Sequence, residues 1–296
     1  MWEQYLKEIS EGNRKTLARC ISLIENEAPG YETLLQLLPV SNTPVIGITG
    51  PPGAGKSTLA DALIGQVVAQ GKKVAVLCVD PSSPFHLGAL LGDRIRMSDW
   101  YTNPNVFIRS LATRGSLGGL SAKIIEVCDL VKAAGFDFIF VETVGVGQSE
   151  IEIAGLADLT AVVLVPEAGD EVQTMKAGLM EIADIFVVNK SDRPGADLFV
   201  KNLRSMLAPA FQNQQEIQII KTIAAAREGI EELYHCIQQI NSEKRINSRR
   251  YWLLAEKAYQ LISRKRMKDI DKAELKASIE KNADGFNLYK FISRYY

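Results

Sequence analysis

A glycine-rich stretch that ends in a lysine and two hydroxyl residues stands in the first fifth of the chain. Residues 50–58, Gly-Pro-Pro-Gly-Ala-Gly-Lys-Ser-Thr, match the pattern G-x-x-x-x-G-K-[ST] in full, and a helix is predicted directly after them at 59–70. Glycines leave backbone N–H groups open to approach, and a helix that follows points its positive dipole end at them, so such a loop binds phosphate groups. We expect Lys56 to reach the β- and γ-phosphates of a nucleotide and the Ser57 hydroxyl to be a ligand of Mg²⁺. The predicted phosphate-binding set is Gly50, Gly53, Ala54, Gly55, Lys56, Ser57 and Thr58.

Two carboxylates follow apolar runs that the sequence predicts to be strands. Asp80 ends the run 74–79, and Glu142 ends the run 136–141 and opens Glu-Thr-Val-Gly145, a D-x-x-G pattern with glutamate in place of aspartate. We expect both acids near the magnesium, with the longer arm of Glu142 making contact through a bound water. The backbone N–H of Gly145 can approach the γ-phosphate, so this loop can sense hydrolysis. Exposed loop acids are the alternative for both carboxylates.

A third motif, Asn189-Lys190-Ser191-Asp192, matches N-K-x-D and predicts which base is bound. The Asp192 carboxylate can accept hydrogen bonds from N1–H and the exocyclic amine of guanine, whereas adenine offers an acceptor there, and such polar recognition discriminates by about 10⁴ to 10⁵. Asn189 is expected to tie this loop to the phosphate loop, and the Lys190 stem to lie along the base. The backbone N–H of Ala224 is expected to meet guanine O6, although Ile223 replaces the serine of the usual Ser-Ala pair.

These motifs must be positioned by a sheet with helices on both sides. Short β-branched runs without strict polar alternation predict buried strands, and helical segments separate most of them. The predicted class is therefore α/β, a P-loop fold with a doubly wound, mostly parallel sheet and helical N- and C-terminal extensions. Strands are predicted at 45–49, 74–79, 106–110, 136–141, 159–165, 185–188 and 218–221. Apolar residues recur at helical spacing over 2–38, with a break at Pro29-Gly30, and again over 249–267 and 271–281. We therefore divide the chain into an N-terminal helical arm (1–43), a GTP-binding domain (44–240) and a C-terminal helical arm (241–296).

Composition excludes several other classes. The 296 residues are 47% hydrophobic and 23% charged, with 34 Lys and Arg against 35 Asp and Glu, as in ordinary globular proteins. A net charge of -1 argues against a nucleic-acid or membrane-surface partner. Four widely spaced cysteines, without a secretory pattern over 1–15 or a long apolar run, predict a cytoplasmic protein with buried thiols.

Longer strings in the same regions resemble the MeaB/ArgK-like family of methylmalonyl-CoA mutase accessory GTPases. They are Val79-Asp-Pro-Ser-Ser-Pro84, Gly88-Ala-Leu-Leu-Gly-Asp-Arg-Ile-Arg-Met97, Arg109-Ser-Leu-Ala-Thr-Arg-Gly115, Glu142-Thr-Val-Gly-Val-Gly-Gln-Ser-Glu150 and Gly169-Asp-Glu-Val-Gln-Thr-Met-Lys176. The resemblance covers almost all of residues 44–230 and extends more loosely into both helical arms. The N-terminal arm is shorter than is usual for the family.

The resemblance implies more than the motifs do. It implies a homodimeric GTPase that binds GTP, GDP and Mg²⁺ and contacts an adenosylcobalamin-dependent acyl-CoA mutase, where it gates cofactor loading and protects the enzyme as a chaperone. Asp80 and Asp93 would lie in a first switch, with Asp93 joining Ser57, Asp80 and Glu142 around the metal. Residues 145–150 would form a second switch and 165–176 a third, with Asp170 and Lys176 in partner-dependent signalling. The C-terminal helices would form the dimerisation arm.

The residue at position 146 predicts that intrinsic GTP hydrolysis is slow. In Ras-type proteins a glutamine that positions the attacking water follows D-x-x-G directly, but Val146 stands there. Intrinsic hydrolysis should then be slow, on the roughly 10⁻⁴ s⁻¹ scale of unassisted Ras, until a partner reshapes the switches. We expect Gln148, Lys176 and Arg114 to be recruited for GTP hydrolysis when a partner binds. The predicted catalytic set is Lys56, Asp80, Glu142, Gly145, Gln148 and Lys176.

Three other functions fit parts of this pattern. A nickel-insertion accessory GTPase would share the fold but normally carries clustered His and Cys ligands, whereas this chain has two histidines and no paired cysteines. An ArgK-like kinase would transfer the γ-phosphate to a protein or small molecule. A scaffold that does not hydrolyse would bind GTP without releasing phosphate.

Overall fold

Seven parallel strands form one sheet in the part of the chain that can be described. The computed structural model describes residues 1–80, 97–112, 121, 123–143, 153–168, 180, 182–207, 217–242, 248–281 and 286–295. The strands are β1 (Val45–Thr49), β2 (Val74–Asp80), β3 (Val106–Ala112), β4 (Phe138–Glu142), β5 (Leu159–Leu164), β6 (Ile185–Asn189) and β7 (Gln218–Thr222). Each lies within two residues of a predicted strand, so the predicted doubly wound α/β fold is confirmed.

The strand order places β1 at the centre of the sheet. The order is β3-β2-β4-β1-β5-β6-β7. Strands β2, β3 and β4 therefore lie on one side of β1, with β4 inserted between β1 and β2, and strands β5, β6 and β7 follow in sequence on the other side. Strand order reverses at β1, and open parallel sheets bind ligands at the carboxyl ends of the strands beside such a point. The loops after β1, β4, β6 and β7 all leave at this edge.

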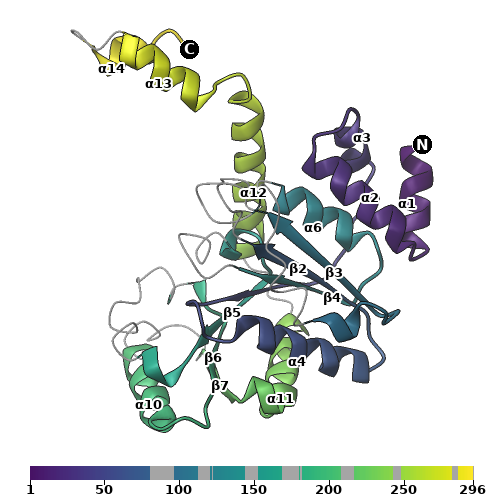
Figure 1. Cartoon of the computed structure of the whole chain (residues 1–296), viewed down its shortest axis with the longest axis vertical. Helices are drawn as coiled ribbons and strands as arrows, with labels where there is room; N and C mark the ends of the chain where they lie inside the picture. The colour runs from purple at the N-terminus through teal and green to yellow at the C-terminus, as the bar shows by residue number, and fades with distance from the viewer. Residues whose placement is uncertain are drawn as a thin grey trace. The chain divides into compact units, whose positions relative to one another are not determined.

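Helices lie along both faces of the sheet (Figure 1). Among the described residues of the first unit they are α1 (Trp2–Ser10), α2 (Arg14–Glu25), α3 (Tyr31–Gln36), α4 (Lys56–Ala69), α6 (Ile124–Lys132), α10 (Ala196–Leu207) and α11 (Ile230–Ser242). Short 3-10 turns are η1 (Ser98–Trp100), η2 (Ile153–Gly155), η3 (Pro166–Ala168) and η5 (Ala224–Ala226). Helix α4 begins at Lys56, three residues before the predicted start, because Gly55 takes the left-handed conformation directly ahead of it.

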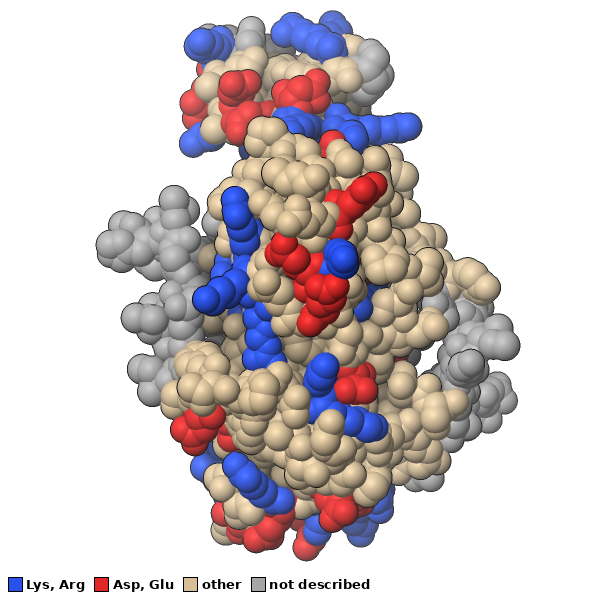
Figure 2. Space-filling view, turned by 90° about the vertical axis from the view of Figure 1, so that its right-hand side faces the viewer, with Lys and Arg blue, Asp and Glu red and all other residues tan. Residues whose placement is uncertain are grey.

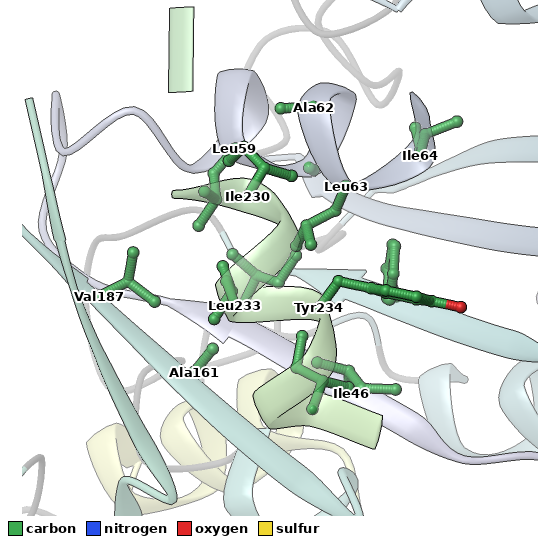
Figure 3. Close-up of a cluster of buried hydrophobic side chains, with 14 of the residues drawn as sticks. Ile46, Leu59, Ala62, Leu63, Ile64, Ala161, Val187, Ile230, Leu233 and Tyr234 are labelled. Atoms are coloured by element: carbon green, nitrogen blue, oxygen red, sulfur yellow. The ribbon is translucent and has the colours of Figure 1, made fainter. Parts of the chain in front are cut away.

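The main hydrophobic core lies between the sheet and helices α4 and α11. Figure 3 shows Leu59 and Leu63 of α4 and Leu233 of α11 directed at side chains of the central strands. The next residues along the same strands point the other way, where Phe186 and Val188 pack with Phe199 and Leu203 of α10. Burial on both faces explains why these strands lack polar alternation in the sequence.

The N-terminal helices pack against the sheet domain. Apolar side chains of α1, α2 and α3 are buried, and α2 contacts α6. The predicted break at Pro29-Gly30 is confirmed, since α2 ends at Glu25 and α3 begins at Tyr31. A second break, between α1 and α2, was not predicted. It falls at Gly12, which has a φ of 89°, and Asn13, whose side chain accepts a hydrogen bond from Thr16 N and caps α2.

The chain divides into two compact units, Met1–Ile246 and Asn247–Tyr296. The second unit contains α12 (Ser248–Arg266), α13 (Lys272–Lys281) and α14 (Leu288–Ile292), close to the predicted helices at 249–267 and 271–281. Phe291 is its buried residue among those described, and its ring contacts the rings of Phe286 and Tyr295. Helix α12 exposes large apolar side chains, which are Tyr251, Leu254, Tyr259 and Ile262.

The described surface carries mixed charge. On the face drawn in Figure 2, Lys and Arg side chains are interspersed with Asp and Glu side chains and with uncharged residues. Within the described ranges, no helix combines the length and apolar character needed to cross a lipid bilayer.

Candidate nucleotide-binding site

The phosphate loop connects β1 to α4 and requires glycine at two places. Gly50 has a φ of 138° and Gly55 a φ of 88°, a region that residues with a Cβ rarely adopt. A Cβ on Gly50 would overlap the carbonyl oxygen of Val163, and one on Gly55 would overlap Asn189 Nδ2. The loop therefore packs closely against Val163 in β5 and Asn189 at the end of β6.

Lys56 is held inside this loop. Its side chain is 7% exposed, and Nζ donates hydrogen bonds to the carbonyl oxygens of Gly50 at 2.9 Å and Pro51 at 3.0 Å. Through these contacts the Lys56 side chain folds back toward the first residues of the loop. The ammonium group therefore lies among the backbone groups that would surround a phosphate chain.

Ser57 and Glu142 meet in the centre of the site. Ser57 Oγ donates to Glu142 Oε1 at 2.6 Å, and the two residues are 7% and 4% exposed. The contact joins the first turn of α4 to the last residue of β4, because β1 and β4 are neighbours in the sheet and Ile48 lies opposite Glu142. A hydroxyl and a carboxylate that come from 85 residues apart in sequence thus lie side by side.

Two threonines, at the end of β1 and directly after β4, were not predicted to belong to the site. Thr143 Oγ1 donates to Thr49 Oγ1 at 3.0 Å, and Thr143 N donates to Ile48 O at 3.1 Å. Both threonines are buried, and they extend the junction between the ends of β1 and β4. Thr143 follows Glu142 in the predicted D-x-x-G variant, so its place in that motif was the available signal.

Asn189 is the centre of a buried hydrogen-bond network. Its Nδ2 donates to Ala54 O at 2.9 Å, while its Oδ1 accepts from Ala224 N at 3.0 Å and Thr222 Oγ1 at 3.2 Å. The residue is 2% exposed. One side chain thus fixes the phosphate loop, the end of β6 and the loop after β7 relative to one another. Thr222 was not among the residues that the sequence singled out.

The neighbouring residues of the N-K-x-D motif project outward. Lys190 has a φ of 56° and donates from Nζ to Gly53 O at 2.8 Å, and Asp192 is exposed beside it. Arg193 forms an ion pair with Glu167 of η3, and the hydrogen bond to Arg193 holds the pKa of Glu167 below its ordinary value. Lys190 bridges to the phosphate loop, which leaves the Asp192 carboxylate accessible from solvent.

Ala224 takes part in this arrangement through its backbone. Its N–H donates to Asn189 Oδ1, and a bridge between Ile223 and Glu228 closes the turn around η5. Ile223 stands where the usual pattern has serine, and its backbone N–H and carbonyl hold this turn. The contact of the Ala224 N–H with guanine O6 stays a prediction.

The Ser57–Glu142 pair fits a magnesium ion. Mg²⁺ binds hard oxygen ligands and keeps several waters, so one hydroxyl and one carboxylate beside a phosphate loop are a suitable donor set. The pair is buried and lies at the N-terminus of α4. Within the described ranges, no group of three or more His, Cys, Asp or Glu residues could hold a metal ion.

Several predicted residues lie outside the described part of the chain. They are Asp93, Arg114, Gly145, Gln148, Asp170 and Lys176, together with the side chain of Asp80, whose backbone ends β2. The described residues of the predicted site come together at the carboxyl edge of β1, β4, β6 and β7.

A family model described as methylmalonyl Co-A mutase-associated GTPase MeaB matches residues 17–276. The chain belongs to this family. A Pyrococcus horikoshii protein whose name describes it as a GTPase is 47% identical over 243 residues, which cover 80% of this chain and 77% of that protein. GTPase ArgK of Escherichia coli is 38% identical over 244 residues, which cover 78% of this chain and 73% of ArgK. The family resemblance predicted from the sequence is therefore confirmed, and GTP and GDP are the nucleotides of the family's GTPases.

Solved structures agree with this fold. The chain is similar to a crystal structure of a LAO/AO transport system kinase, with a TM-score of 0.68, 26% identity and coverage of 99% of this chain and 96% of the other. HypB from Helicobacter pylori in complex with nickel has a TM-score of 0.52 and 16% identity, with coverage of 77% and 97%. The second likeness concerns the fold alone.

Proposed function

We propose that this chain binds GTP at the carboxyl edge of β1 and hydrolyses it to GDP and phosphate. The observation that carries the proposal is Asn189, whose side chain holds the phosphate loop at Ala54 and the loop after β7 at Ala224 in one network. A phosphate-binding loop and a guanine-reading loop fixed to each other in this way suit a single guanine nucleotide. The GTPase names of the relatives support the same reading.

The chain's own residues supply most of what hydrolysis needs. Backbone N–H groups of residues 53–57 and the N-terminus of α4 would bind the phosphate oxygens, and Lys56 would neutralise charge on the β- and γ-phosphates. Water attacks the γ-phosphorus, and the bond between the γ-phosphorus and the bridging β–γ oxygen breaks. Ser57 and Glu142 would hold Mg²⁺, which supplies further neutralisation of the phosphate charge when bound. We further propose slow intrinsic turnover, because Val146 stands where Ras-type proteins place glutamine.

We propose that the GTPase serves as a chaperone for an adenosylcobalamin-dependent acyl-CoA mutase, with methylmalonyl-CoA mutase as the first candidate. The description of the matching family model, which names this mutase, supports the proposal. In this role GTP binding and hydrolysis would gate cofactor loading and protect the enzyme. Asp170 and Lys176 are proposed for signalling to the partner, and Gln148, Lys176 and Arg114 for hydrolysis once the partner is bound. Gly145 is proposed to approach the γ-phosphate, and Asp80 and Asp93 are proposed near the metal.

We also propose a homodimer formed through the second unit. Tyr251, Leu254, Tyr259 and Ile262 recur at spacings that place them on one face of α12, and each is more than half exposed in the single chain. Large apolar side chains gathered on one helix face are typical of an interface. A second copy of the chain would cover them.

One experiment tests the partner proposal. One sample of the tagged protein is loaded with a non-hydrolysable GTP analogue and a second sample with GDP. Each sample is used to capture proteins from the cells in which the protein occurs. A captured enzyme with a cobalamin-binding domain that also raises the rate of GTP hydrolysis would support the proposal. Purified methylmalonyl-CoA mutase that neither binds nor changes the rate would contradict it for that enzyme.

A kinase is the second candidate, because the structure that covers 99% of this chain is named as a transport system kinase. GTP labelled at the γ-phosphorus separates the two functions. Label recovered only as inorganic phosphate supports hydrolysis, whereas label transferred to a protein or small molecule supports the kinase. The nickel-insertion alternative rests on likeness of fold alone.

A further inference from the structure

A hydrogen bond between two buried threonines lies one residue beyond the Ser57–Glu142 pair. Thr49 is the last residue of β1 and directly precedes Gly50, the first residue of the phosphate loop. Thr143 directly follows Glu142, the last residue of β4. Thr143 Oγ1 donates to Thr49 Oγ1 at 3.0 Å. This bond therefore joins the residue before the phosphate loop to the residue after the candidate metal ligand.

The two threonines point to the face of the sheet away from α4. Ile48 packs in the core with α4, and Glu142 bonds Ser57 of α4, so the side chains of Ile48 and Glu142 lie on the α4 face. Thr143 N donates to Ile48 O at 3.1 Å, which continues the pairing of β4 with β1 by one residue. Successive side chains of a strand point to opposite faces. Thr49 and Thr143 therefore act on Glu142 from the other face, through the backbone.

The surroundings of this hydrogen bond are apolar. Thr49 lies opposite Val162 of β5, which packs in the core that includes Phe199 of α10. Two residues before Thr49, on the same face, a Cβ on Gly47 would lie 2.5 Å from Ile153 Cγ1. Both threonines are at most 2% exposed. Valine has the same branched shape and no polar group to bury, so valine at both positions would satisfy the packing. We attribute the hydroxyls to a need that packing does not meet, which is a fixed direction between the two strand ends.

Glu142 is the residue that these contacts fix. Its Oε1 accepts a hydrogen bond from Ser57 Oγ at 2.6 Å, and its backbone is paired with Ile48. The hydrogen bonds from Thr143 to β1 hold the backbone directly after it. Mg²⁺ demands near-ideal octahedral geometry, so a change in the direction of a carboxylate ligand weakens its binding. Removal of a group that orients a metal ligand typically lowers metal affinity by about 10- to 100-fold.

We propose that Thr49 and Thr143 are positioning residues, whose hydrogen bond sets the direction of the Glu142 carboxylate and thereby the affinity of the site for Mg²⁺. The proposal rests on the proposed function, in which a guanine nucleotide and Mg²⁺ are bound together. The phosphate loop is held separately, by the hydrogen bond from Asn189 to Ala54. Loss of the threonine hydrogen bond therefore weakens the binding of Mg²⁺ without weakening the binding of nucleotide in the absence of the metal.

The test uses substitutions that keep the shape of each threonine. Thr49→Val and Thr143→Val, alone and combined, remove the hydrogen bond, whereas Thr143→Ser keeps a hydroxyl. Thr160→Val is the control, because Thr160 is a fully buried threonine in β5 whose hydroxyl bonds no described residue. The affinity of a fluorescent GDP analogue is measured in EDTA and over a range of Mg²⁺ concentrations. These titrations give the Kd of the analogue without metal and the Kd of Mg²⁺ in the complex.

Thr49→Val and Thr143→Val are expected to raise the Kd of Mg²⁺ by about tenfold or more and to leave the Kd of the GDP analogue in EDTA unchanged. The combined variant should raise the Kd of Mg²⁺ no further than either single variant, because all three lose the same bond. Thr143→Ser and Thr160→Val should match the wild type. An unchanged Kd of Mg²⁺ in the combined variant, or an equal loss of affinity for the analogue in EDTA, would overturn the proposal.

Unfolding in urea separates this proposal from the proposed function. In the nucleotide-free protein, Ser57→Ala and Thr143→Val are measured alone and combined. Ser57 lies on the α4 side of the sheet and Thr143 points to the other side, so we expect their effects on the free energy of unfolding to be non-additive through Glu142. Additive effects would overturn the positioning role. A wild type that binds no guanine nucleotide would instead overturn the proposed function, and this coupling would then decide the positioning role alone.

Discussion

At the scale of single residues, Asn189 joins more parts of the site than any other side chain whose hydrogen bonds are described above. It bonds Ala54, Thr222 and Ala224, which belong to three separate segments. The sequence motif predicts a tie to the phosphate loop, but it does not predict the two partners in and just after β7, Thr222 and Ala224. Those partners depend on the register of β6 and β7, in which Asn189 lies opposite Thr222.

Asn189→Ala is therefore expected to destabilise the protein as well as weaken nucleotide binding. The substitution leaves the buried N–H of Ala224 without its acceptor, and each buried polar group that loses its partner costs about 1 to 3 kcal/mol. We expect a loss of about 2 to 4 kcal/mol in the free energy of unfolding, measured by urea titration. Asn202→Ala on the exposed face of α10 is the control and should stay within about 0.5 kcal/mol of the wild type. A stable Asn189→Ala protein would contradict the network.

Cys20 gives a prediction about alkaline pH. Burial raises the pKa of its thiol from 9.0 to about 11. The unfolded chain therefore loses this proton at a lower pH than the folded one, so the stabilisation is complete below about pH 9 and is lost as the pH rises toward 11. Unfolding titrations between pH 8 and pH 10.5 should show a steeper loss of stability for the wild type than for Cys20→Ala. Parallel curves would show that the folded protein does not shield this thiol.

At the scale of elements, the phosphate loop depends on glycine for two separate reasons. Gly50 and Gly71 both have positive φ, but a Cβ would overlap a backbone oxygen only at Gly50, while the space around Gly71 is open. Gly71→Ala should cost only the strain of a left-handed residue, about 1 to 2 kcal/mol. Gly50→Ala adds the overlap with Val163 O and should cost about 3 to 5 kcal/mol. Equal stabilities in thermal unfolding would contradict the packing of the loop against β5.

The elements could be predicted from the sequence, but of the contacts between them only some could, such as the tie from Asn189 to the phosphate loop. All seven strands follow from buried β-branched runs, and the phosphate loop follows from its spacing of glycines and lysine. The start of α4 was placed three residues late, because helical periodicity does not reveal the left-handed conformation of Gly55. The pairing of Glu25 with Arg109 joins residues 84 positions apart, and no periodicity carries such information.

At the scale of the whole molecule, the division at Ile246 separates the candidate nucleotide site from the helices that we propose for dimerisation. The described site residues all lie in the first unit, and the exposed apolar face of α12 lies in the second. A chain truncated to residues 1–246 is expected to stay folded and to bind GTP as the full chain does. In light scattering at matched concentrations, we expect the truncated chain to be monomeric and the full chain to be dimeric. A truncated chain that remains dimeric would contradict the assignment of dimerisation to the second unit.

The most direct measurement of the central claim is the base preference of the protein before and after Asp192→Asn. The wild type should bind GTP at least about 10⁴-fold more tightly than ATP, because guanine offers the Asp192 carboxylate two hydrogen-bond donors that adenine does not offer. The variant should lose affinity for GTP and gain affinity for xanthosine triphosphate, whose carbonyl at C2 accepts a hydrogen bond from the asparagine amide. Equal binding of ATP and GTP by the wild type, or an unchanged preference in the variant, would contradict the claim that this site reads guanine.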